Sequence, residues 1–468
     1  MVHGIHSSTI DMPGIKDILL AKIRNGEQLS LGELVKLVIF LSIPTLLAQL
    51  SSVLMGYIDT AMVGRLGASE SASIGLISTS TWLFHGFCMA TSCGFSVQIA
   101  HLIGSNNFKQ ARQVLREGLV SALIFGLLLG GAGMAISSRL PVWLGGSPEI
   151  VRDAAGYFFI FCAFIPFYQI CHTAGYILQA SGNTKVPSIL NMMMCGLDVI
   201  FNFIFIFGLG MGVKGAALGT GVAELVTAVL MLGFLVLRSP ELNLKQDSGS
   251  FLPRRRTLSN AFKISSPMWL QNAITRGAHI MSTIIIAPLG PVAIAANSFA
   301  ITAESFCYMP GYGLQDASTA IIGQSLGAGR KDLARRFSRI TISLGAGIMA
   351  VLAVFMYIFA PELMGILSID PAVVNLGAQM LRIVAFAEAM FGVSIVAYGC
   401  CVGAGDTLVP SIMNLGSMWI VRIGLALILT PRLGLKGYWI AMSIELVFRG
   451  AIFILRIHGK RWLNSRFA

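Results

Sequence analysis

Long apolar segments, each near the length that crosses a lipid bilayer, recur along the whole chain. ALIFGLLLGGAGMAI (122–136) is one such run, and a spanning helix needs about 20 residues of this kind. We count twelve segments, which begin near residues 35, 69, 113, 150, 184, 212, 260, 291, 337, 373, 407 and 435. Charged residues make up only 12% of the chain and hydrophobic residues 55%, whereas a soluble domain is about 25% charged. The predicted fold class is therefore an all-α polytopic membrane protein with twelve transmembrane helices.

The second half of the chain repeats the first at a constant offset in numbering. VPSILN at 186–191 returns as VPSIMN at 409–414, so the offset is 409 − 186 = 223, and by the same offset Pro44 maps to Pro267. Each copy carries six spans, and an even number of spans returns the chain to its starting side, so both halves have the same orientation. The sequence thus predicts two six-helix lobes related by a pseudo-two-fold axis along the membrane normal.

The domain boundaries and the orientation follow from these spans. We expect an N-terminal tail over 1–34, a first lobe over 35–238, a polar linker over 239–259, a second lobe over 260–458 and a C-terminal tail over 459–468. Placing the tails, the linker and the even-to-odd connections in the cytoplasm gives that side 23 Lys and Arg, against six on the other side and four within spans. This bias predicts cytoplasmic termini. The N-terminal tail is too polar for a cleaved signal peptide, and the compact length favours a multi-pass protein of a bacterial inner membrane.

Other sequence features narrow the class of function. The eight cysteines lie in or beside apolar spans without a C-x-x-C pair, which argues against a disulfide framework or a zinc site. The net charge of +12 comes from juxtamembrane clusters that topology and anionic lipid explain, so no nucleic-acid partner is expected. The chain lacks a G-x-x-x-x-G-K-[ST] loop for ATP. Two similar bundles that rock about a central site describe a secondary carrier, with no cofactor beyond a coupling ion and no enzyme activity.

Several strings, in chain order, resemble the multidrug and toxic compound extrusion (MATE) family. They are SIPTLLAQL, YIDTAMVGRLG, LQASGNTKVPSILN, LDVIFNFIFIFGLGMGVKGAALGT, APLGPVAIAANSFA, ESFCYMPGYGL, IIGQSLGAGR and VGAGDTLVPS. Together they cover the chain from about residue 35 to 458, and they are closer to the DinF-like branch than to the NorM-like branch. The resemblance implies a twelve-helix, cation-coupled antiporter, with H⁺ or Na⁺ as the coupling ion, that exports cationic amphiphiles. We expect it to act as a monomer.

Asp59 and Asp198 are acids of the first half that lie within apolar spans. A charge at bilayer depth costs at least about 2.5–3.5 kcal/mol, so by default it faces a cavity or a partner. Both positions match acids that the DinF-like branch uses to bind protons or sodium, and neither has an acidic counterpart at the repeat-related positions, Ser282 and Val421. We predict a cation-coupling site in the N-terminal lobe, with purely structural hydrogen bonding as the alternative.

The residues around these acids depart from the family in one respect. Branch members often carry Asn one turn before the second acid, where this chain has Met194. Asn191 and Asn202 can share the helix face of Asp198. Thr220 matches the family's span 6 threonine, although back-bonding within its own helix is an equal alternative. Because hard cations need several oxygen ligands, the missing Asn favours protons; sodium at the two acids is the alternative, and no other metal is expected.

The second lobe carries a different set of ionisable residues. Glu304, Glu388 and Asp316 lie there, with Arg276 nearby. We predict that these four residues line the substrate cavity and that the cavity is mostly acidic, which would attract a cationic substrate. Pairing of the charges with one another is the alternative, because an unpaired charge in lipid is costly.

Pro44 precedes Asp59 on the same predicted span, at a spacing of 59 − 44 = 15. In the DinF-like branch a proline at this spacing has been proposed as the point where helix 1 bends on protonation. Proline removes one backbone hydrogen bond and weakens the helix at that point. We predict such a bend at Pro44, with a static kink as the alternative.

Three other classes fit parts of the sequence. A flippase for a lipid-linked saccharide or another lipid, from the same superfamily, is also a duplicated carrier, but usually has more spans and a strongly cationic cavity. The major facilitator class is disfavoured because IGSNNFKQAR (103–112) lacks the G-x-x-x-D-R-x-G-R-[RK] loop. A membrane hydrolase would need a nucleophile and base or a metal-binding His–Glu pattern, which the chain lacks. The flippase is the alternative that we keep.

Overall fold

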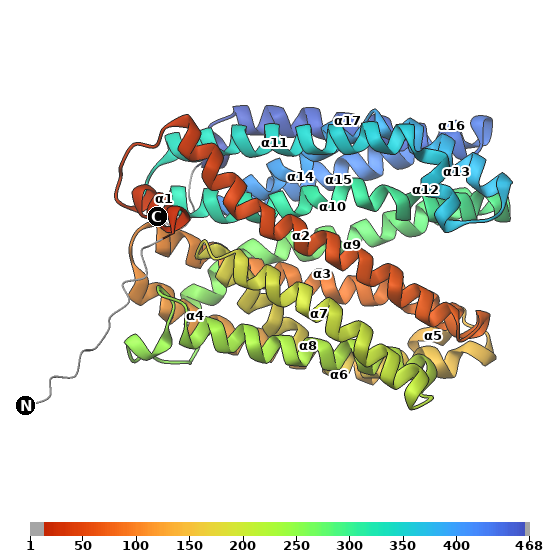
Figure 1. Cartoon of the computed structure of the whole chain (residues 1–468), viewed down its shortest axis with the longest axis horizontal. Helices are drawn as coiled ribbons and strands as arrows, with labels where there is room; N and C mark the ends of the chain where they lie inside the picture. The colour runs from red at the N-terminus through yellow and green to blue at the C-terminus, as the bar shows by residue number, and fades with distance from the viewer. Residues whose placement is uncertain (1–13, 464–468) are drawn as a thin grey trace, which may run out of the picture.

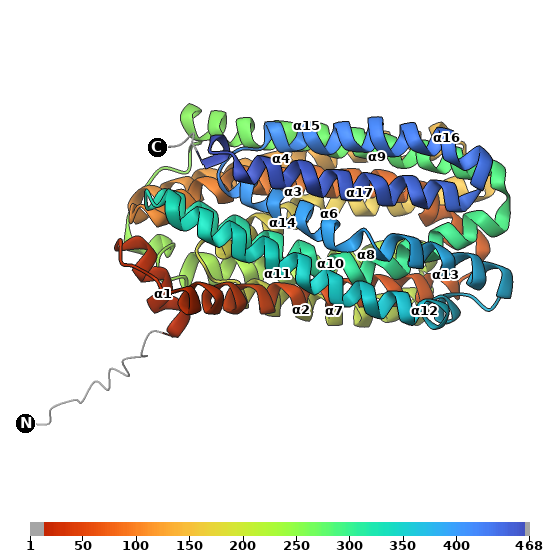
Figure 2. The same cartoon turned by 90° about the horizontal axis from the view of Figure 1, so that it is seen from above.

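The chain folds into long helices that run side by side, and the described chain begins and ends at the same end of the bundle (Figures 1 and 2). This computed structural model describes residues 14–463 and contains no strand within that range. In the first half the helices are α1 (Ile15–Arg24), α2 (Leu31–Gly64), α3 (Ala68–Gly104), α4 (Phe108–Ile136), α5 (Leu140–Trp143), α6 (Pro148–Ala180), α7 (Lys185–Phe203), η1 (Ile204–Gly208), α8 (Gly212–Leu237) and η2 (Leu244–Gln246). In the second half they are α9 (Arg255–Ile286), η3 (Ala287–Leu289), α10 (Pro291–Gly327), α11 (Lys331–Ile358), α12 (Ala360–Leu367), α13 (Pro371–Ala385), α14 (Glu388–Gly403), α15 (Leu408–Gly416), η4 (Ser417–Ile423), α16 (Gly424–Leu433), α17 (Leu435–His458) and η5 (Arg461–Leu463).

The twelve predicted spans all form helices, which confirms the fold class. Within the described residues, nine helices are long and apolar enough to cross a membrane. A tenth span consists of α13 and α14, which are bent by 60° at the break between them. The remaining two, α9 and α17, have 32 and 24 residues and so sufficient length, but they are more polar. We expected one continuous helix from about residue 373; the break instead places Glu388, fully buried, in the first turn of α14.

The first spanning helix of each half packs against the other half. α2 packs against α7 of its own half and against α10 of the second, and α9 packs against α3 and α15; in Figure 1, α2 runs diagonally across the bundle. Thr45 on α2 donates a hydrogen bond to the carbonyl of Gly313 on α10 (2.9 Å), and Ser265 on α9 donates one to the carbonyl of Ala90 on α3 (2.8 Å). The two carbonyls differ in number by 313 − 90 = 223, the offset of the repeat, and the two donors by 265 − 45 = 220, so the two crossings occupy related places in the two halves although the donors are shifted by three residues.

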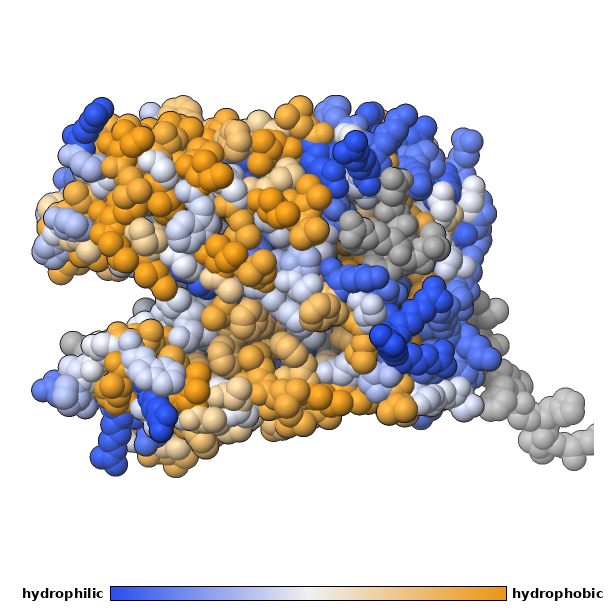
Figure 3. Space-filling view, turned by 180° about the vertical axis from the view of Figure 1, so that it is seen from behind, coloured by the Kyte–Doolittle hydropathy of each residue, from blue (hydrophilic) through white to orange (hydrophobic). Residues whose placement is uncertain are grey.

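The two ends of the molecule differ on the surface. Hydrophobic side chains cover the helices along their length, and hydrophilic side chains gather at the end where the described chain starts and stops (Figure 3). At the opposite end the surface is notched between the two halves (Figure 3). The two halves are therefore in contact at the end that carries the termini and part at the other.

The end that carries the termini is closed by α1 and by the linker. In α1 the side chains of Leu19, Leu20 and Ile23 are buried, although we expected residues 1–34 to form a polar tail. Arg24 pairs with Glu241 of the linker at 3.1 Å. Residues 1–13 and 464–468, which belong to the predicted tails, lie outside the described residues.

The linker is tied to α4 through one carboxylate. Asp247 pairs with Arg112 and with Arg116, each at 2.7 Å. Burial by itself would raise the pKa of Asp247, but the hydrogen bonds and charges of the two arginines outweigh it and hold this pKa below its ordinary value.

Candidate functional site

The two acids of the first half meet through one amide. Asn202 lies one helical turn after Asp198 on α7, and its Nδ2 donates hydrogen bonds to Asp59 Oδ1 on α2 (3.0 Å) and to Asp198 Oδ2 (3.1 Å). Asp198 is fully buried and Asn202 is 2% exposed, whereas Asp59 is only partly buried. The structure therefore brings together three of the predicted coupling residues in one inter-helix cluster.

Close packing of α7 on α8 forms the back of this cluster. A methyl group built on Gly219 of α8 would overlap the Asn202 side chain, so only glycine lets the two helices approach this closely. The next residue, Thr220, interacts with Asp198 through its hydroxyl. Asn191, two turns before Asp198, is partly buried and takes no part in the hydrogen bonds that join the two acids.

Two oxygens in this cluster lack a hydrogen-bond donor among the described residues. Oδ1 of Asp198 and Oδ1 of Asn202 are buried and unpartnered among the described residues. Unpaired buried acceptors cost about 1–3 kcal/mol each, and two carboxylates in one low-dielectric site repel each other. A proton or a cation at this position would remove both penalties.

Glu224 adds a third acid near this cluster, itself buried, which sequence reasoning missed. It lies one turn after Thr220 on α8, is 8% exposed and has an unpartnered Oε2 among the described residues. The carboxylate of Asp198 is near enough to repel the carboxylate of Glu224 electrostatically, and the Glu224 side chain lies close to Cys171. The signal was present in the sequence, because Glu224 is an acid inside an apolar span.

Pro44 lies within α2 and does not interrupt it. α2 is a continuous helix of 34 residues from Leu31 to Gly64. The next residue, Thr45, is buried and donates to carbonyls of its own helix as well as to Gly313 on α10. The region around Pro44 is thus held between the two halves, and bending on protonation stays a prediction.

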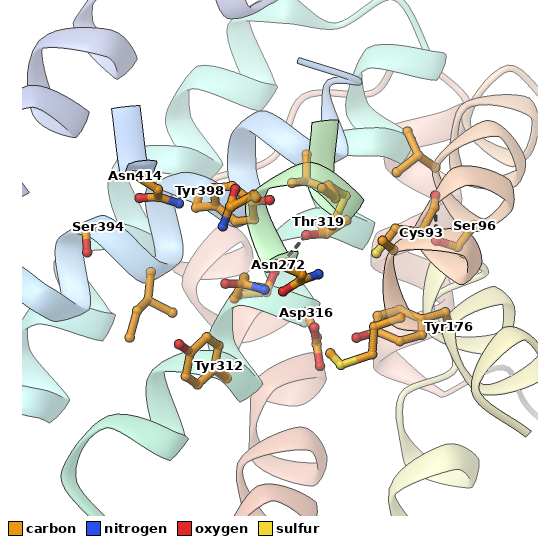
Figure 4. A pocket seen from close by; sticks show the side chains of 18 of the residues that line it. Cys93, Ser96, Tyr176, Asn272, Tyr312, Asp316, Thr319, Ser394, Tyr398 and Asn414 are labelled. Atoms are coloured by element: carbon orange, nitrogen blue, oxygen red, sulfur yellow. Dashed lines mark hydrogen bonds between the residues drawn. The ribbon is translucent and has the colours of Figure 1, made fainter. Parts of the chain in front are cut away.

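A central cavity of about 300 Å³ lies between the halves, in the part of the molecule nearer the termini. Its walls come from α3, α6, α9, α10, α14, α15, η4 and α17. Figure 4 shows Asp316 between Tyr312 and Tyr176, with Asn272 beside it. Phenol, amide and hydroxyl groups give this cavity hydrogen-bonding capacity, and aliphatic side chains such as Val97 and Ile395 make up part of the same wall.

The charges of the cavity differ from the mostly acidic set that we predicted. Asp316 and Arg276 line it as expected, but Glu304 and Glu388 lie outside it, and Arg449 lines it instead. The helix geometry explains this: Asp316 follows Glu304 by twelve positions on α10, and at 3.6 residues per turn the two side chains point about 120° apart. The cavity therefore carries two arginines and one acid, together with His279.

Glu304 and Glu388 form a separate buried pair inside the second half. Glu304 is 4% exposed and Glu388 is fully buried, and the two side chains interact with each other. Both oxygens of Glu388 are without a hydrogen-bond partner of good geometry among the described residues. Arg422 acts on Glu304 electrostatically, but its hydrogen bonds go elsewhere.

The hydrogen bonds of Arg422 go to Glu445, which sequence reasoning also missed. Arg422 Nη2 lies 2.7 Å from Glu445 Oε2, and Arg449 Nη2 lies 2.5 Å from Glu445 Oε1. Ser417 donates to the same carboxylate at 2.7 Å. Glu445 and Arg449 are one turn apart on α17, a spacing that could have indicated the pair.

Comparison with known proteins identifies the family. The family model described as MatE matches residues 44–204 and again 267–428, and the starts of the two matches keep the offset of the repeat, 267 − 44 = 223. The chain belongs to the MATE family. Members of this family are transporters, so the protein is a multi-pass membrane transporter and not an enzyme.

Curated relatives of this MATE protein are similar over almost their full lengths. It is 24% identical over 436 residues to a probable multidrug resistance protein NorM from Thermotoga maritima, covering 92% of this chain and 93% of the relative. It is also 24% identical over 446 residues to the multidrug resistance protein MdtK of Yersinia pestis, covering 91% and 95%.

Solved transporter structures share the fold. The Vibrio cholerae MATE transporter VcmN in its bent form superposes with a TM-score of 0.84 at 20% identity, covering 93% of this chain and 98% of that one. A transporter of the MOP superfamily from Pyrococcus furiosus, described as having a binding pocket of reverse polarity that suggests a different function, gives 0.85 at 20% identity, covering 92% and 98%.

Proposed function

We propose that this MATE protein is a cation-coupled antiporter that exports amphipathic organic compounds by alternating access, with the proton as its coupling ion. The observation that carries the proposal is the Asp59–Asn202–Asp198 cluster, in which one amide links two carboxylates and buried oxygens are left without donors among the described residues. Protons or a cation entering this cluster would neutralise like charges and satisfy those oxygens.

The shape and the charge bias support export as the direction of transport. The excess of Lys and Arg in the tails, the linker and the even-to-odd connections favours cytoplasmic termini in a bacterial inner membrane. The notch at the opposite end would then face outward. Asp59 lies near Gly64, the end of α2 that is farther from the termini, so a cation that enters from outside reaches the Asp59 cluster first. Antiport requires the cation and the substrate to favour different states of the protein, which is negative coupling between their sites.

The substrate site is the central cavity, used by the transporter as a monomer. A volume of about 300 Å³ is at the lower end of the range for small-molecule sites. Tyr176, Tyr312 and Tyr398 offer aromatic surfaces, and Asp316 offers a negative charge for a cationic group. The multidrug resistance names of the relatives support export of such compounds.

A second candidate function rests on the arginines of the same cavity. Arg276 has a buried Nε without a hydrogen-bond partner among the described residues, and Arg449 also lines the wall. Guanidinium groups bind carboxylates and phosphates well. An anionic amphiphile, such as a lipid-linked saccharide moved by a flippase, is therefore the alternative substrate class.

The test is transport in proteoliposomes with either a proton gradient or a sodium gradient imposed alone. A fluorescent organic cation and a fluorescent organic anion of similar size are compared as substrates. We expect the proton gradient to drive the cation, and Asp59→Asn and Asp198→Asn to abolish this transport. Asp332→Asn, the same change at an exposed position, is the matched control. Transport driven by sodium alone, or normal transport by both variants, would refute proton coupling at this cluster, and exclusive movement of the anion would favour the alternative.

A further inference from the structure

The ends of α3 and α10 meet across the two halves at the end that carries the termini. A methyl group built on Gly104 of α3 would overlap the carbonyl of Gln324 on α10, and one built on Gly327 of α10 would overlap the carbonyl of His101 on α3. Each helix therefore needs glycine at this point, because any side chain would separate the two backbones.

Two hydrogen bonds run between the halves beside this contact. His101 Nε2 donates to the carbonyl of Gly403 at 2.9 Å, since a carbonyl can only accept. Gln324 Nε2 donates to the carbonyl of Ala180 at 2.7 Å. His101 is 6% exposed and Gln324 is 1% exposed, so both bonds are shielded from water.

The internal repeat relates every part of this arrangement. The donors differ in number by 324 − 101 = 223, and the acceptors differ by 403 − 180 = 223. Each half thus gives one donor and one carbonyl to the other half, and the two bonds are equivalent under the pseudo-two-fold axis. A chance pair of polar contacts would not keep the same offset at both partners.

The acceptors are well placed for bonds that form and break. Ala180 is the last residue of α6 and Gly403 is the last residue of α14. Carbonyls in the last turn of a helix have no partner within the helix. When the halves separate here, water can take the place of His101 and Gln324 at these carbonyls, so no buried acceptor is left unpaired.

We propose that the His101–Gly403 and Gln324–Ala180 hydrogen bonds form a two-fold lock that holds the transporter closed at the end carrying the termini. A rocking motion that opens the cavity at this end moves α3 away from α14 and α10 away from α6, so it must break both bonds. In the structure the lock is formed and the opposite end is notched, so this conformation is closed at the end carrying the termini and open at the other end. Loss of the lock shifts the protein towards the state that is open at the end carrying the termini.

The native Cys93 reports this opening, because it lines the central cavity, whereas Cys400 is fully buried away from it. Membrane vesicles are selected in which the linker faces the medium, as shown by protease cleavage. A membrane-impermeant thiol reagent is added, and the rates at which adducts form on Cys93 and Cys400 are followed by mass spectrometry. In the His101→Ala, Gln324→Ala double variant we expect the Cys93 rate to rise roughly 5- to 150-fold, the effect of losing two net hydrogen bonds, while the Cys400 rate stays unchanged.

Two variants serve as matched controls. Ser325→Ala removes a buried hydroxyl that has no partner among the described residues, directly beside Gln324, and should leave the Cys93 rate as in the wild type. His101→Gln replaces the histidine by the residue at its repeat-related position and should keep the rate low, because the amide can still donate. A double variant whose Cys93 rate matches that of Ser325→Ala overturns the proposal, and so does an equal rise for Cys93 and Cys400, which indicates unfolding. The assay adds no substrate, imposes no ion gradient and keeps one pH throughout, so its result does not depend on the outcome of the export test.

Discussion

Glu445→Gln should strongly destabilise the second half of the transporter. Glu445 is fully buried and accepts from Arg422, Arg449 and Ser417 at distances of 2.5–3.0 Å. The native cluster has two positive charges and one negative charge, a net of +1. The variant keeps the shape of the side chain but raises the net charge of the buried cluster to +2.

The size of the effect follows from the burial of the arginines that remain. Their side chains are 9% and 14% exposed, so neither can turn fully to water. Removing one partner of a buried ion pair costs about 3–5 kcal/mol, because the other charges stay buried without compensation. If this cost falls on the native state, the rate of thermal inactivation at a fixed temperature rises about 150- to 5,000-fold, at about 1.4 kcal/mol per factor of ten.

The assay is the half-life of the purified protein in detergent at one temperature, measured by fluorescence-detected size-exclusion chromatography, because large membrane proteins inactivate irreversibly. Glu362→Gln, the same change at an exposed position of α12, should change the half-life less than threefold. Adding Arg422→Met to Glu445→Gln returns the net charge to +1 and should recover much of the half-life. The reasoning fails if Glu445→Gln decays as slowly as Glu362→Gln, or if the second substitution brings no recovery.

Three further changes test other parts of the structure. Gly327→Ala forces a methyl group into the carbonyl of His101. The overpacking should cost roughly 1–3 kcal/mol of stability and lower the temperature of half-inactivation. In the control Gly131→Ala the added methyl meets no atom within 4 Å, so this temperature should stay as in the wild type. Asp247 has a lowered pKa, so its stabilisation of the linker is complete above the ordinary carboxyl pKa of about 4 and is lost as the pH falls through the lowered value. Limited proteolysis should therefore cut the wild-type linker rapidly only under strong acid. The linker of Asp247→Asn should be cut rapidly already at about pH 7. Arg276→Gln removes one positive charge from the cavity wall, and at about 8 Å and an effective dielectric constant of about 20 this charge opposes a bound cation by about 2 kcal/mol. The Kd of a fluorescent organic cation, measured by anisotropy, should therefore fall roughly 10- to 30-fold. An unchanged or higher Kd would contradict this account of the cavity.

The fold could be predicted from the sequence because the membrane restricts the choice so strongly. Apolar segments of the right length must form helices in lipid, and the internal repeat sets their number and orientation. The break between α13 and α14 could not be predicted in this way. The two residues at the break are Phe386 and Ala387, and neither is a helix breaker such as proline or glycine. The bend therefore depends on how α14 packs in the second half.

The parts of the candidate sites that depend on neighbours within one helix could be predicted from the sequence. The parts that depend on how different helices pack together could not. Asp198 and Asn202 are one turn apart on one helix, so their contact follows from the helical repeat. The exclusion of Glu304 from the cavity depends on which face of α10 turns inward, and the apolar positions on either side do not determine that. The ion pair between Arg422 and Glu445 joins η4 to α17. The segment η4 is a π-helix, and its wider turn changes the directions of the side chains from those in an α-helix.

The crossing of α2 and α9 has a consequence for biosynthesis. A ribosome releases the chain from its N-terminus, so α2 enters the membrane well before α10, the helix on which much of its surface packs. The first half by itself therefore keeps α7 but lacks α10 as a neighbour of α2, and the second half keeps α15 but lacks α3 as a neighbour of α9. We therefore expect neither half to fold stably by itself, although each contains a complete copy of the repeat. A single copy with the same crossing would complete its packing only by exchanging its first spanning helix with a second molecule, as in a domain-swapped dimer, and fusion of two such copies would make that exchange intramolecular.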